Sequence, residues 1–367
     1  MSGTFRQRFT DKVLPYCRAA LQHKSLPSLL FDMARHQLSI ATSPADYLRY
    51  EFYKGERSMA EKKRYLSKRG SHYFPWNKNP VSQLALFDNK LLFKKFLLGC
   101  GIDQAKLLAT IGPQFELCDR ASFCDWLGTL RQDVVFKPTL GSGGQGIRLL
   151  TCSGDGLRER DKMINADTLW RELRQIPDAA YIVEERLRNR ADIAAFNPGC
   201  LNTLRIVTIR TDDDTWHISL VALRVGSAHS AVDNLAAGGT TVKFSADGVG
   251  VAAYDWTQKC MVERHADSGL PLVGFALGQF DAICQLALAW ARHFPDMGAI
   301  GWDIALTDTG PKVVEANPYF DSWYFQMGSM GPLLTDAVAA GLTPRRLFAA
   351  WDRRYISPRL KRHRIHA

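Results

Sequence analysis

Short apolar runs bounded by turn residues recur along the second half of the chain and predict strands. The clearest pair covers residues 302–307 and 312–317, which flank Asp308-Thr309-Gly310. This composition is typical of a short hairpin loop in which the glycine takes a positive φ angle. We therefore expect an antiparallel hairpin that is closed by a three-residue loop.

Further strands are predicted where β-branched and apolar residues run between turn signals. They cover residues 134–138, 147–150, 181–185, 201–210, 217–225 and 241–244. In the run 201–210 the residues alternate, so Asn202, Leu204 and Ile206 face one way and Thr203, Arg205 and Val207 the other. A mobile glycine-containing loop at 233–239 is expected to join the last two strands.

Helices are predicted after Asp88-Asn89, at 167–176 and at 275–294. In the last segment Phe280, Ile283, Ala287 and Trp290 recur at helical spacing, which favours a helix that packs on a sheet. Residues 1–86 are polar and mainly helical in pattern. The chain therefore predicts an α+β protein with a helical N-terminal region (1–86), two α+β subdomains (87–186 and 187–345) and a basic tail (346–367).

The composition places the 367-residue chain among globular proteins, because 46% of its residues are hydrophobic and 23% are charged. Eight cysteines are scattered without a CxxC pair or zinc spacing, so reduced thiols and a cytoplasmic location are expected. The N-terminus carries no apolar signal region, and no stretch has the length of a membrane span.

The formal net charge of +10 is concentrated at residues 54–69 and 353–364. Neither cluster has interleaved aromatic residues or a groove-reading motif, so sequence-specific nucleic-acid binding is not expected. Solvated helix faces explain both clusters, and weak contact of the basic tail with a polyanion or an anionic surface is the alternative.

The candidate chemistry begins with the hairpin. A three-residue loop places Asp303 opposite Glu315, with Asn317 on the same face. Like charges opposite each other are unfavourable unless a cation lies between them, and ligands that offer only oxygen suit Mg²⁺ or Mn²⁺. The alternative is a surface hairpin with solvated acids.

A second candidate is the segment 141–146, GSGGQG, which follows Lys137-Pro138 and precedes another strand. Glycines let backbone N–H groups approach phosphate oxygens closely, so the segment predicts a flap over phosphates, with a flexible hairpin as the alternative. A dinucleotide fold needs a helix after the loop, a P-loop needs GK[ST], and a protein kinase needs HRD and DFG; none of these follows.

Three further positions carry weaker signals. Lys90 lies in the first turn of a helix, where a cation opposes the helix dipole unless an anion is near. Glu184 and Glu185 end a buried strand before a linker, which is typical of either a purine hinge or surface ion pairs. Arg205 lies among apolar neighbours and requires an anionic partner, either structural or a ligand.

Taken in order, these motifs resemble the ATP-grasp superfamily, and most closely its sugar-transfer-associated, α-L-glutamate ligase-like group. The resemblance covers about residues 88–321. It is carried by DNKLLFKKFL, VVFKPTLGSGGQGI, YIVEE, LNTLRIVT, VDNLAAGG and GWDIALTDTGPKVVEANP.

The resemblance implies an ATP-grasp fold in which ATP lies between two α+β subdomains. The implied nucleotide-binding residues are Lys90, Lys137, Gly143, Gly144, Gln145, Gly146, Glu184, Glu185 and Leu187. Asp303, Glu315 and Asn317 would hold Mg²⁺ (or Mn²⁺), while Arg205 and Lys137 would act on the transferred phosphoryl group.

The activity implied by the resemblance is ADP-forming ligation of a carboxylate to an amine through an acyl phosphate, on small-molecule or polymer-precursor substrates. A role in cell-surface polysaccharide or related biosynthesis is implied with it. Phosphoryl transfer depends on positioning and charge neutralisation, which cations and backbone donors supply. Two alternatives stay open: a phosphotransferase to a hydroxyl group, and a nucleotide-binding module without turnover.

Overall fold

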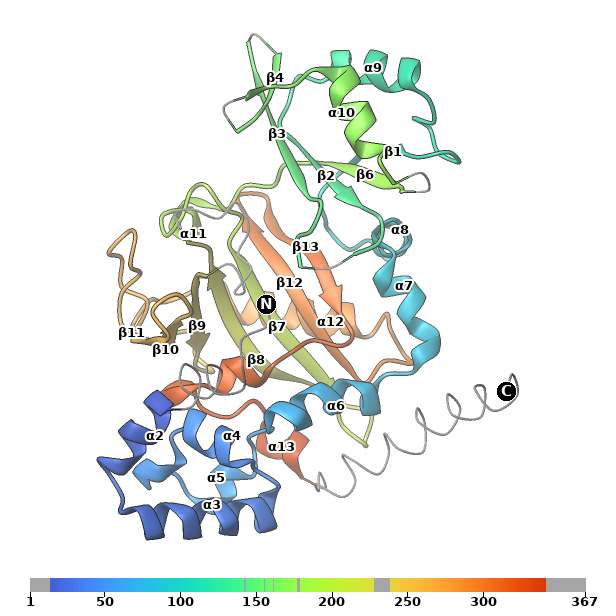
Figure 1. Cartoon of the computed structure of the whole chain (residues 1–367). Helices are drawn as coiled ribbons and strands as arrows, with labels where there is room; N and C mark the ends of the chain where they lie inside the picture. The colour runs from blue at the N-terminus through green and yellow to red at the C-terminus, as the bar shows by residue number, and fades with distance from the viewer. Residues whose placement is uncertain are drawn as a thin grey trace, which may run out of the picture.

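The computed structural model describes residues 14–141, 143–154, 156–160, 162–176, 179–227 and 238–340. The predicted basic tail at 346–367 and most of the predicted loop at 233–239 lie outside these residues. Figure 1 shows a helical N-terminal part below a large sheet, and a smaller sheet with two helices above it.

The N-terminal part is built from short helices, as predicted. They are α2 (Leu14–Leu21), α3 (Leu26–Ile40), α4 (Pro44–Arg49), η1 (Phe52–Lys54), α5 (Met59–Lys62), α6 (Lys68–Lys78), η2 (Val81–Gln83) and α7 (Leu84–Asp88). The hydroxyls of Ser43, Ser58 and Ser67 accept hydrogen bonds from the first turns of α4, α5 and α6 and fix where these helices begin. Aromatic residues such as Tyr47 and Phe52 form a separate core.

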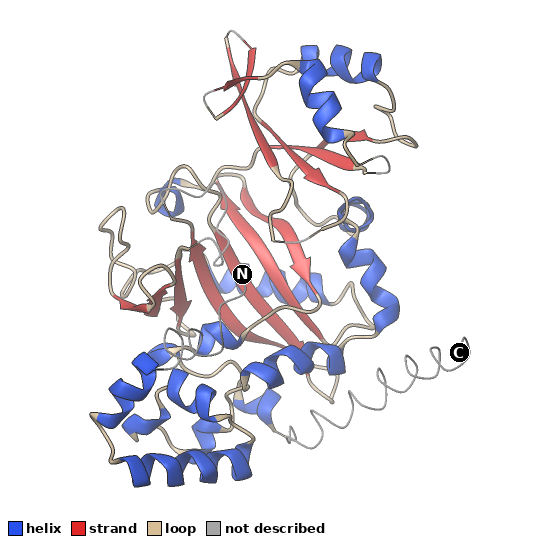
Figure 2. Ribbon diagram, viewed as in Figure 1, coloured by secondary structure: helices blue, strands red, loops and turns tan. Residues whose placement is uncertain are grey.

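The smaller sheet has the strand order β1-β6-β2-β3-β4-β5. Its strands are β1 (Leu107–Ile111), β2 (Val134–Pro138), β3 (Arg148–Ser153), β4 (Gly156–Glu159), β5 (Lys162–Met163) and β6 (Tyr181–Glu185). Helices α9 (Arg120–Thr129) and α10 (Ala166–Leu173) contribute to the same apolar core as β2 and β3. Figure 2 shows both helices on one side of this sheet.

The larger sheet has the order β11-β10-β9-β8-β7-β12-β13. Its strands are β7 (Thr203–Arg210), β8 (Trp216–Val225), β9 (Thr240–Phe244), β10 (Gly250–Asp255), β11 (Cys260–Val262), β12 (Ala299–Thr307) and β13 (Gly310–Asn317). A short helix, α11 (Ala191–Ala194), follows the linker from β6. The predicted α+β class, with a helical N-terminal region, is therefore confirmed.

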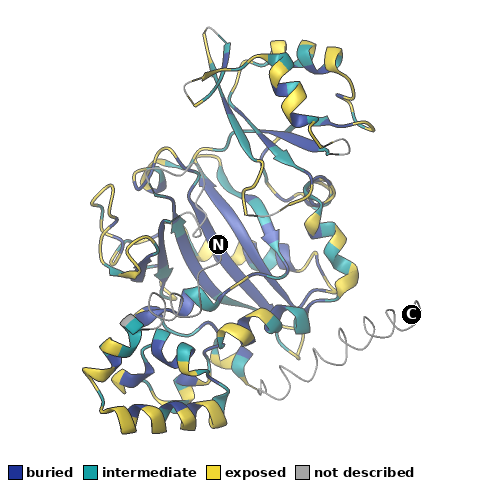
Figure 3. Cartoon of the chain, viewed as in Figure 1, coloured by how far each residue is buried: buried dark blue, intermediate teal, exposed yellow. Residues whose placement is uncertain are grey.

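Both faces of the larger sheet are covered, so β7 and β12 are buried along almost their whole length (Figure 3). Helices α8 (Lys90–Gly99) and α12 (Phe280–Ala291) pack on one face, against Leu204 and Ile206. On the other face Val207 lies in a second core with α6 and residues 320–338, which include η4 (Trp323–Gln326), η5 (Gly328–Met330) and α13 (Asp336–Ala339). The predicted alternation along β7 is confirmed.

The hairpin β12–β13 has the predicted pairing at its acids, Asp303 opposite Glu315, but not the predicted loop. Thr307 pairs with Gly310, so the loop has two residues, Asp308 and Thr309, rather than three. A β-bulge after Asp303 adds one residue to β13 and restores the register, because Ile304 pairs with Val313 while Asp303 still pairs with Glu315. Gly310 has the expected positive φ, +111°.

Among the described residues, no helix is both long enough and apolar enough to cross a membrane. All eight cysteines are free thiols. The domain limits given above stay predictions.

Candidate functional site

The acidic residues of the β12–β13 hairpin lie together on the face of the large sheet. Asp303 is buried and pairs directly with Glu315 across the ladder. The side-chain amide of Asn317 donates to Oδ2 of Asp303 at 3.3 Å. The structure therefore brings together the three predicted metal ligands.

Two arginines neutralise Asp303. Arg205 on β7 binds it with both ends of its guanidinium, Nε to Oδ1 at 2.6 Å and Nη2 to Oδ2 at 2.9 Å. Arg224 on β8 lies 3.2 Å from Oδ2 and also donates to the hydroxyl of Thr203. Arg224 carries no signal of its own in the sequence, although it lies on a predicted strand next to β7.

The two carboxyl groups are electrostatically unequal. Burial alone would raise the pKa of Asp303, but Arg205 and Arg224 hold it below the ordinary value. Burial raises the pKa of Glu315, and the charge of Asp303 adds to that shift. A bound cation would therefore stabilise the charged form of Glu315 more than that of Asp303.

The small sheet supplies a second charged cluster. Glu184 on β6 is buried and lies 2.5 Å from the ammonium of Lys137 on β2 and 2.8 Å from that of Lys94 on α8. Burial alone would raise the pKa of Glu184, but the two lysines lower it. Lys94 was not predicted, although its position one helical turn beyond Lys90 places it on the same face of α8.

Lys90 links the two subdomains. Asn89 caps α8 as predicted, with its side chain accepting from the N–H groups of Leu91 and Leu92. The ammonium of Lys90 donates to the carbonyl of Gly141 at 2.6 Å, in the glycine-rich segment. Burial lowers the pKa of Lys90, while the negative charge of Glu315, on the larger sheet, opposes the shift.

The glycine-rich segment joins β2 to β3, as predicted. Gly141, Gly143, Gly144 and Gly146 all have positive φ angles. At Gly146 (φ +73°) a Cβ atom would lie 2.9 Å from Cγ of Pro138, so only glycine fits. Gln145 is exposed at the tip of this segment.

The linker after β6 holds the other predicted hinge residues. The carboxylate of Glu185 accepts from the backbone N–H of Lys106 at 2.9 Å, and Leu187 is partly buried. The linker is fixed to the large sheet where Arg190 N–H donates to the carbonyl of Leu306 at 2.8 Å. The roles predicted for Glu184, Glu185 and Leu187 stay predictions.

The donor set at the hairpin fits a divalent cation. Among the described residues, no group of three or more His, Cys, Asp or Glu side chains could hold a metal ion. A cation here would depend on the carboxylates of Asp303 and Glu315, the amide oxygen of Asn317, and oxygens of the nucleotide. Mg²⁺ commonly binds through one or two carboxylates and substrate phosphates, so this set is sufficient.

Two facing α+β subdomains, with lysines and a glycine-rich segment on one and an Asp/Glu/Asn hairpin on the other, define the ATP-grasp class. A model of the family described as "Sugar-transfer associated ATP-grasp" matches residues 69–338. The chain belongs to this family, and the resemblance found in the sequence is confirmed.

Solved structures give distant matches. An N5-carboxyaminoimidazole ribonucleotide synthetase in an ADP complex matches at 13% identity and TM-score 0.39, over 65% of this chain and 47% of that one. The Thermotoga maritima synthetase matches at 14% and 0.37, over 65% and 44%. A D-alanine–D-alanine ligase from Bacillus anthracis matches at 14% and 0.40, over 77% and 72%.

The chain thus spans less than half the length of the two synthetases. No curated protein sequence matches it.

Proposed function

We propose that this protein is an ATP- and Mg²⁺-dependent ligase that joins a carboxylate to an amine through an acyl phosphate. Membership of an ATP-grasp family supports the use of ATP. The family's description also supports a substrate from sugar or polysaccharide biosynthesis, and a cytoplasmic location is part of the same proposal.

The observation that carries this proposal is the position of Lys90. Its ammonium lies at the glycine-rich segment and is close enough to Glu315 and Lys137 for both to act on its pKa. A cation on α8, the glycine-rich segment of the small sheet and an acid of the large sheet are therefore near one another. A triphosphate with a bound cation complements this arrangement, because its oxygens attract the lysines and the cation attracts the acids.

In the proposed reaction, a carboxylate oxygen of the first substrate attacks the γ-phosphorus of ATP. The bond between this phosphorus and the β,γ-bridging oxygen breaks, and ADP leaves. The amine of the second substrate then attacks the acyl carbon, inorganic phosphate leaves, and the amine proton passes to solvent. Lys90 and Lys137 bind phosphate oxygens, and Gly143 to Gly146 cover them with backbone N–H groups.

The two arginines have different roles in this proposal. The guanidinium of Arg205 is only 5% exposed and its fork is occupied by Asp303, so it positions that carboxylate. Arg224 is 13% exposed, which leaves part of its surface for a phosphoryl oxygen. Asp303, Glu315 and Asn317 would hold Mg²⁺, which supplies charge neutralisation at the phosphates.

The test is a screen of carboxylate and amine pairs in which ADP and free phosphate are both measured. We expect ADP formation that needs both substrates and releases equal phosphate. Glu315→Gln should abolish it, whereas Asp308→Asn, the same change at the exposed turn of this hairpin, should not. ADP without free phosphate would instead indicate transfer to a hydroxyl, and nucleotide binding without turnover would indicate a binding module.

A further inference from the structure

Helix α3 packs against the rest of the protein on one face only. Leu29, Met33 and His36 are buried on its inner face, where they meet the aromatic core of the N-terminal helices. These positions recur every three or four residues, as expected for a helix that is covered on one side. Figure 3 shows α3 at the lower edge of the molecule, with exposed residues along its outer side.

The outer face of α3 is apolar. Leu26, Leu30, Ala34 and Leu38 follow one another at intervals of four residues, which places them in one row along a helix. The three leucines are 55%, 57% and 88% exposed, and Phe31 beside the row is 71% exposed. These five residues are called the α3 stripe below. Isolated exposed leucines are ordinary on a protein surface, whereas a contiguous apolar row marks a surface that binds something.

Cations accompany the α3 stripe. Residues 14–86 contain twelve lysines and arginines but only five acids. Arg35 is exposed and lies one helical turn from both Phe31 and Leu38. Arg18 is also exposed and lies one turn from Leu21 on α2, which is 48% exposed. Exposed apolar and cationic side chains therefore alternate on α2 and α3.

The single acid of α3 is directed away from the α3 stripe. Asp32 is two positions from both Leu30 and Ala34, and two positions on a helix lie on nearly opposite sides. Its carboxylate contacts the ammonium of Lys24 and accepts from the hydroxyl of Tyr47 at 3.2 Å. An anion that approached the stripe would therefore meet the charge of Arg35 and not that of Asp32.

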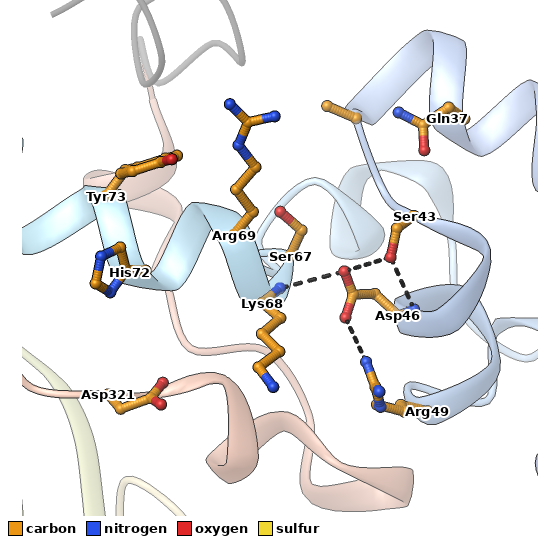
Figure 4. Close-up of a pocket in the computed structure, with 11 residues that line it drawn as sticks. Gln37, Ser43, Asp46, Arg49, Ser67, Lys68, Arg69, His72, Tyr73 and Asp321 are labelled. Atoms are coloured by element: carbon orange, nitrogen blue, oxygen red, sulfur yellow. Dashed lines mark hydrogen bonds and ion pairs between the residues drawn. The ribbon is translucent and has the colours of Figure 1, made fainter. Parts of the chain in front are cut away.

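A polar pocket limits the stripe at the C-terminal end of α3. Gln37 and Ala41 line this pocket together with residues of α4, α6 and Asp321 after β13 (Figure 4). The carboxylate of Asp46 in the pocket accepts from the guanidinium of Arg49 at 3.3 Å. The apolar surface thus has a polar boundary, which is typical of interaction sites.

The shape of the surface favours a flat partner. Figure 1 shows α3 along the outer edge of the N-terminal part, at the opposite end of the molecule from the smaller sheet. A helix in this position presents a ridge and not a groove. An apolar ridge flanked by cations is the arrangement by which helices lie in the interface of a bilayer, with the apolar residues at the acyl boundary and the cations at anionic headgroups.

We propose that the α3 stripe binds an anionic lipid surface. Leu30, Phe31 and Leu38 enter the headgroup region, and Arg18 and Arg35 contact anionic headgroups. Because the smaller sheet lies at the other end of the molecule, the glycine-rich segment stays accessible when the chain is bound. The proposal does not depend on the reaction proposed above.

The test is co-sedimentation of the full chain with two kinds of vesicle, phosphatidylcholine alone and an equal mixture of phosphatidylcholine and phosphatidylglycerol. We expect binding to the mixed vesicles that weakens at higher salt, and much weaker binding to the neutral ones. Leu30→Gln/Leu38→Gln should weaken binding to the mixed vesicles by about tenfold or more. Arg18→Gln/Arg35→Gln should weaken it by about tenfold as well.

The matched control is Leu98→Gln/Ile176→Gln, the same kind of change at positions of α8 and after α10 that are 74% and 66% exposed. It should bind the mixed vesicles as the wild type does. All these side chains are exposed, so the melting temperatures of the variants should stay close to that of the wild type.

The proposal is overturned if the wild type does not bind the mixed vesicles, or if it binds neutral vesicles equally well. It is also overturned if the stripe variant binds as well as the wild type, or if the control variant loses as much affinity. Analytical ultracentrifugation tests the competing occupant, a second copy of this chain. A wild-type dimer that becomes a monomer in Leu30→Gln/Leu38→Gln, without vesicle binding by either, would assign the stripe to self-association and overturn the lipid proposal.

Discussion

Replacing Arg205 by methionine should destabilise the larger sheet strongly. Its guanidinium and the carboxylate of Asp303 are each about 5% exposed and share two hydrogen bonds. Removing one partner of a buried ion pair leaves the other charge uncompensated and costs about 3–5 kcal/mol. Arg224 still contacts Asp303 at 3.2 Å, so we expect the lower end, about 3 kcal/mol.

Differential scanning calorimetry provides the measurement. For a unit of this size, each kcal/mol lowers the melting temperature by about 2–4 °C, so the variant should melt about 6–12 °C earlier. Arg210→Met is the matched control on the same strand, because its partner Asp214 is 82% exposed. An exposed ion pair contributes about 1 kcal/mol or less, and this control should melt close to the wild type.

The double variant Arg205→Met/Asp303→Leu separates a buried ion pair from simple packing. It removes both charges together, so it should recover at least about half of the loss in stability while abolishing turnover. The reasoning is refuted if Arg205→Met melts within about 2 °C of the wild type, or if the effects of the two substitutions add.

Three further results are expected. Lys94→Met should raise the pKa of Glu184, measured by NMR titration, and weaken ATP binding, whereas the exposed neighbour change Lys95→Met should do neither. The pKa of Glu315 is raised in the folded protein, so the metal-free protein should lose stability as pH rises from about 4.5 through that raised pKa. The affinity for Mg²⁺ should increase over the same pH range. Glu315→Gln should remove both pH dependences, and a wild-type protein whose stability does not change with pH would contradict the assignment. Gly146→Ala should weaken ATP binding without lowering the melting temperature of the larger sheet, because the backbone strain of about 1–2 kcal/mol at residue 146 is local. An ATP affinity equal to that of the wild type would exclude a role for the glycine-rich segment in binding.

The hairpin shows how two local errors can cancel. The composition Asp308-Thr309-Gly310 predicted a turn with a glycine at positive φ, but not whether Gly310 belongs to the loop or to the strand. The loop is one residue shorter than predicted, and the bulge after Asp303 adds that residue back. The pairing of Asp303 with Glu315 was therefore predicted correctly, because side-chain alternation constrains which residues share a face.

The sequence alone determined the elements whose signals are local. The cap at Asn89, the strands β2 and β6, the glycine-rich connection and the face of β7 that carries Arg205 all follow from patterns within a few residues. Such patterns act through backbone dihedral angles and the alternation of side chains, which neighbouring residues set.

Only the tertiary structure decided which charges neutralise one another. Lys94 meets Glu184, and Arg205 and Arg224 meet Asp303, across long separations along the chain. The pocket beside Asp321 likewise requires α4, α6 and the segment after β13 to meet. Coulombic attraction and burial depend on distance in space, which sequence spacing does not contain, so these partners emerged only from the packing of the sheets and helices.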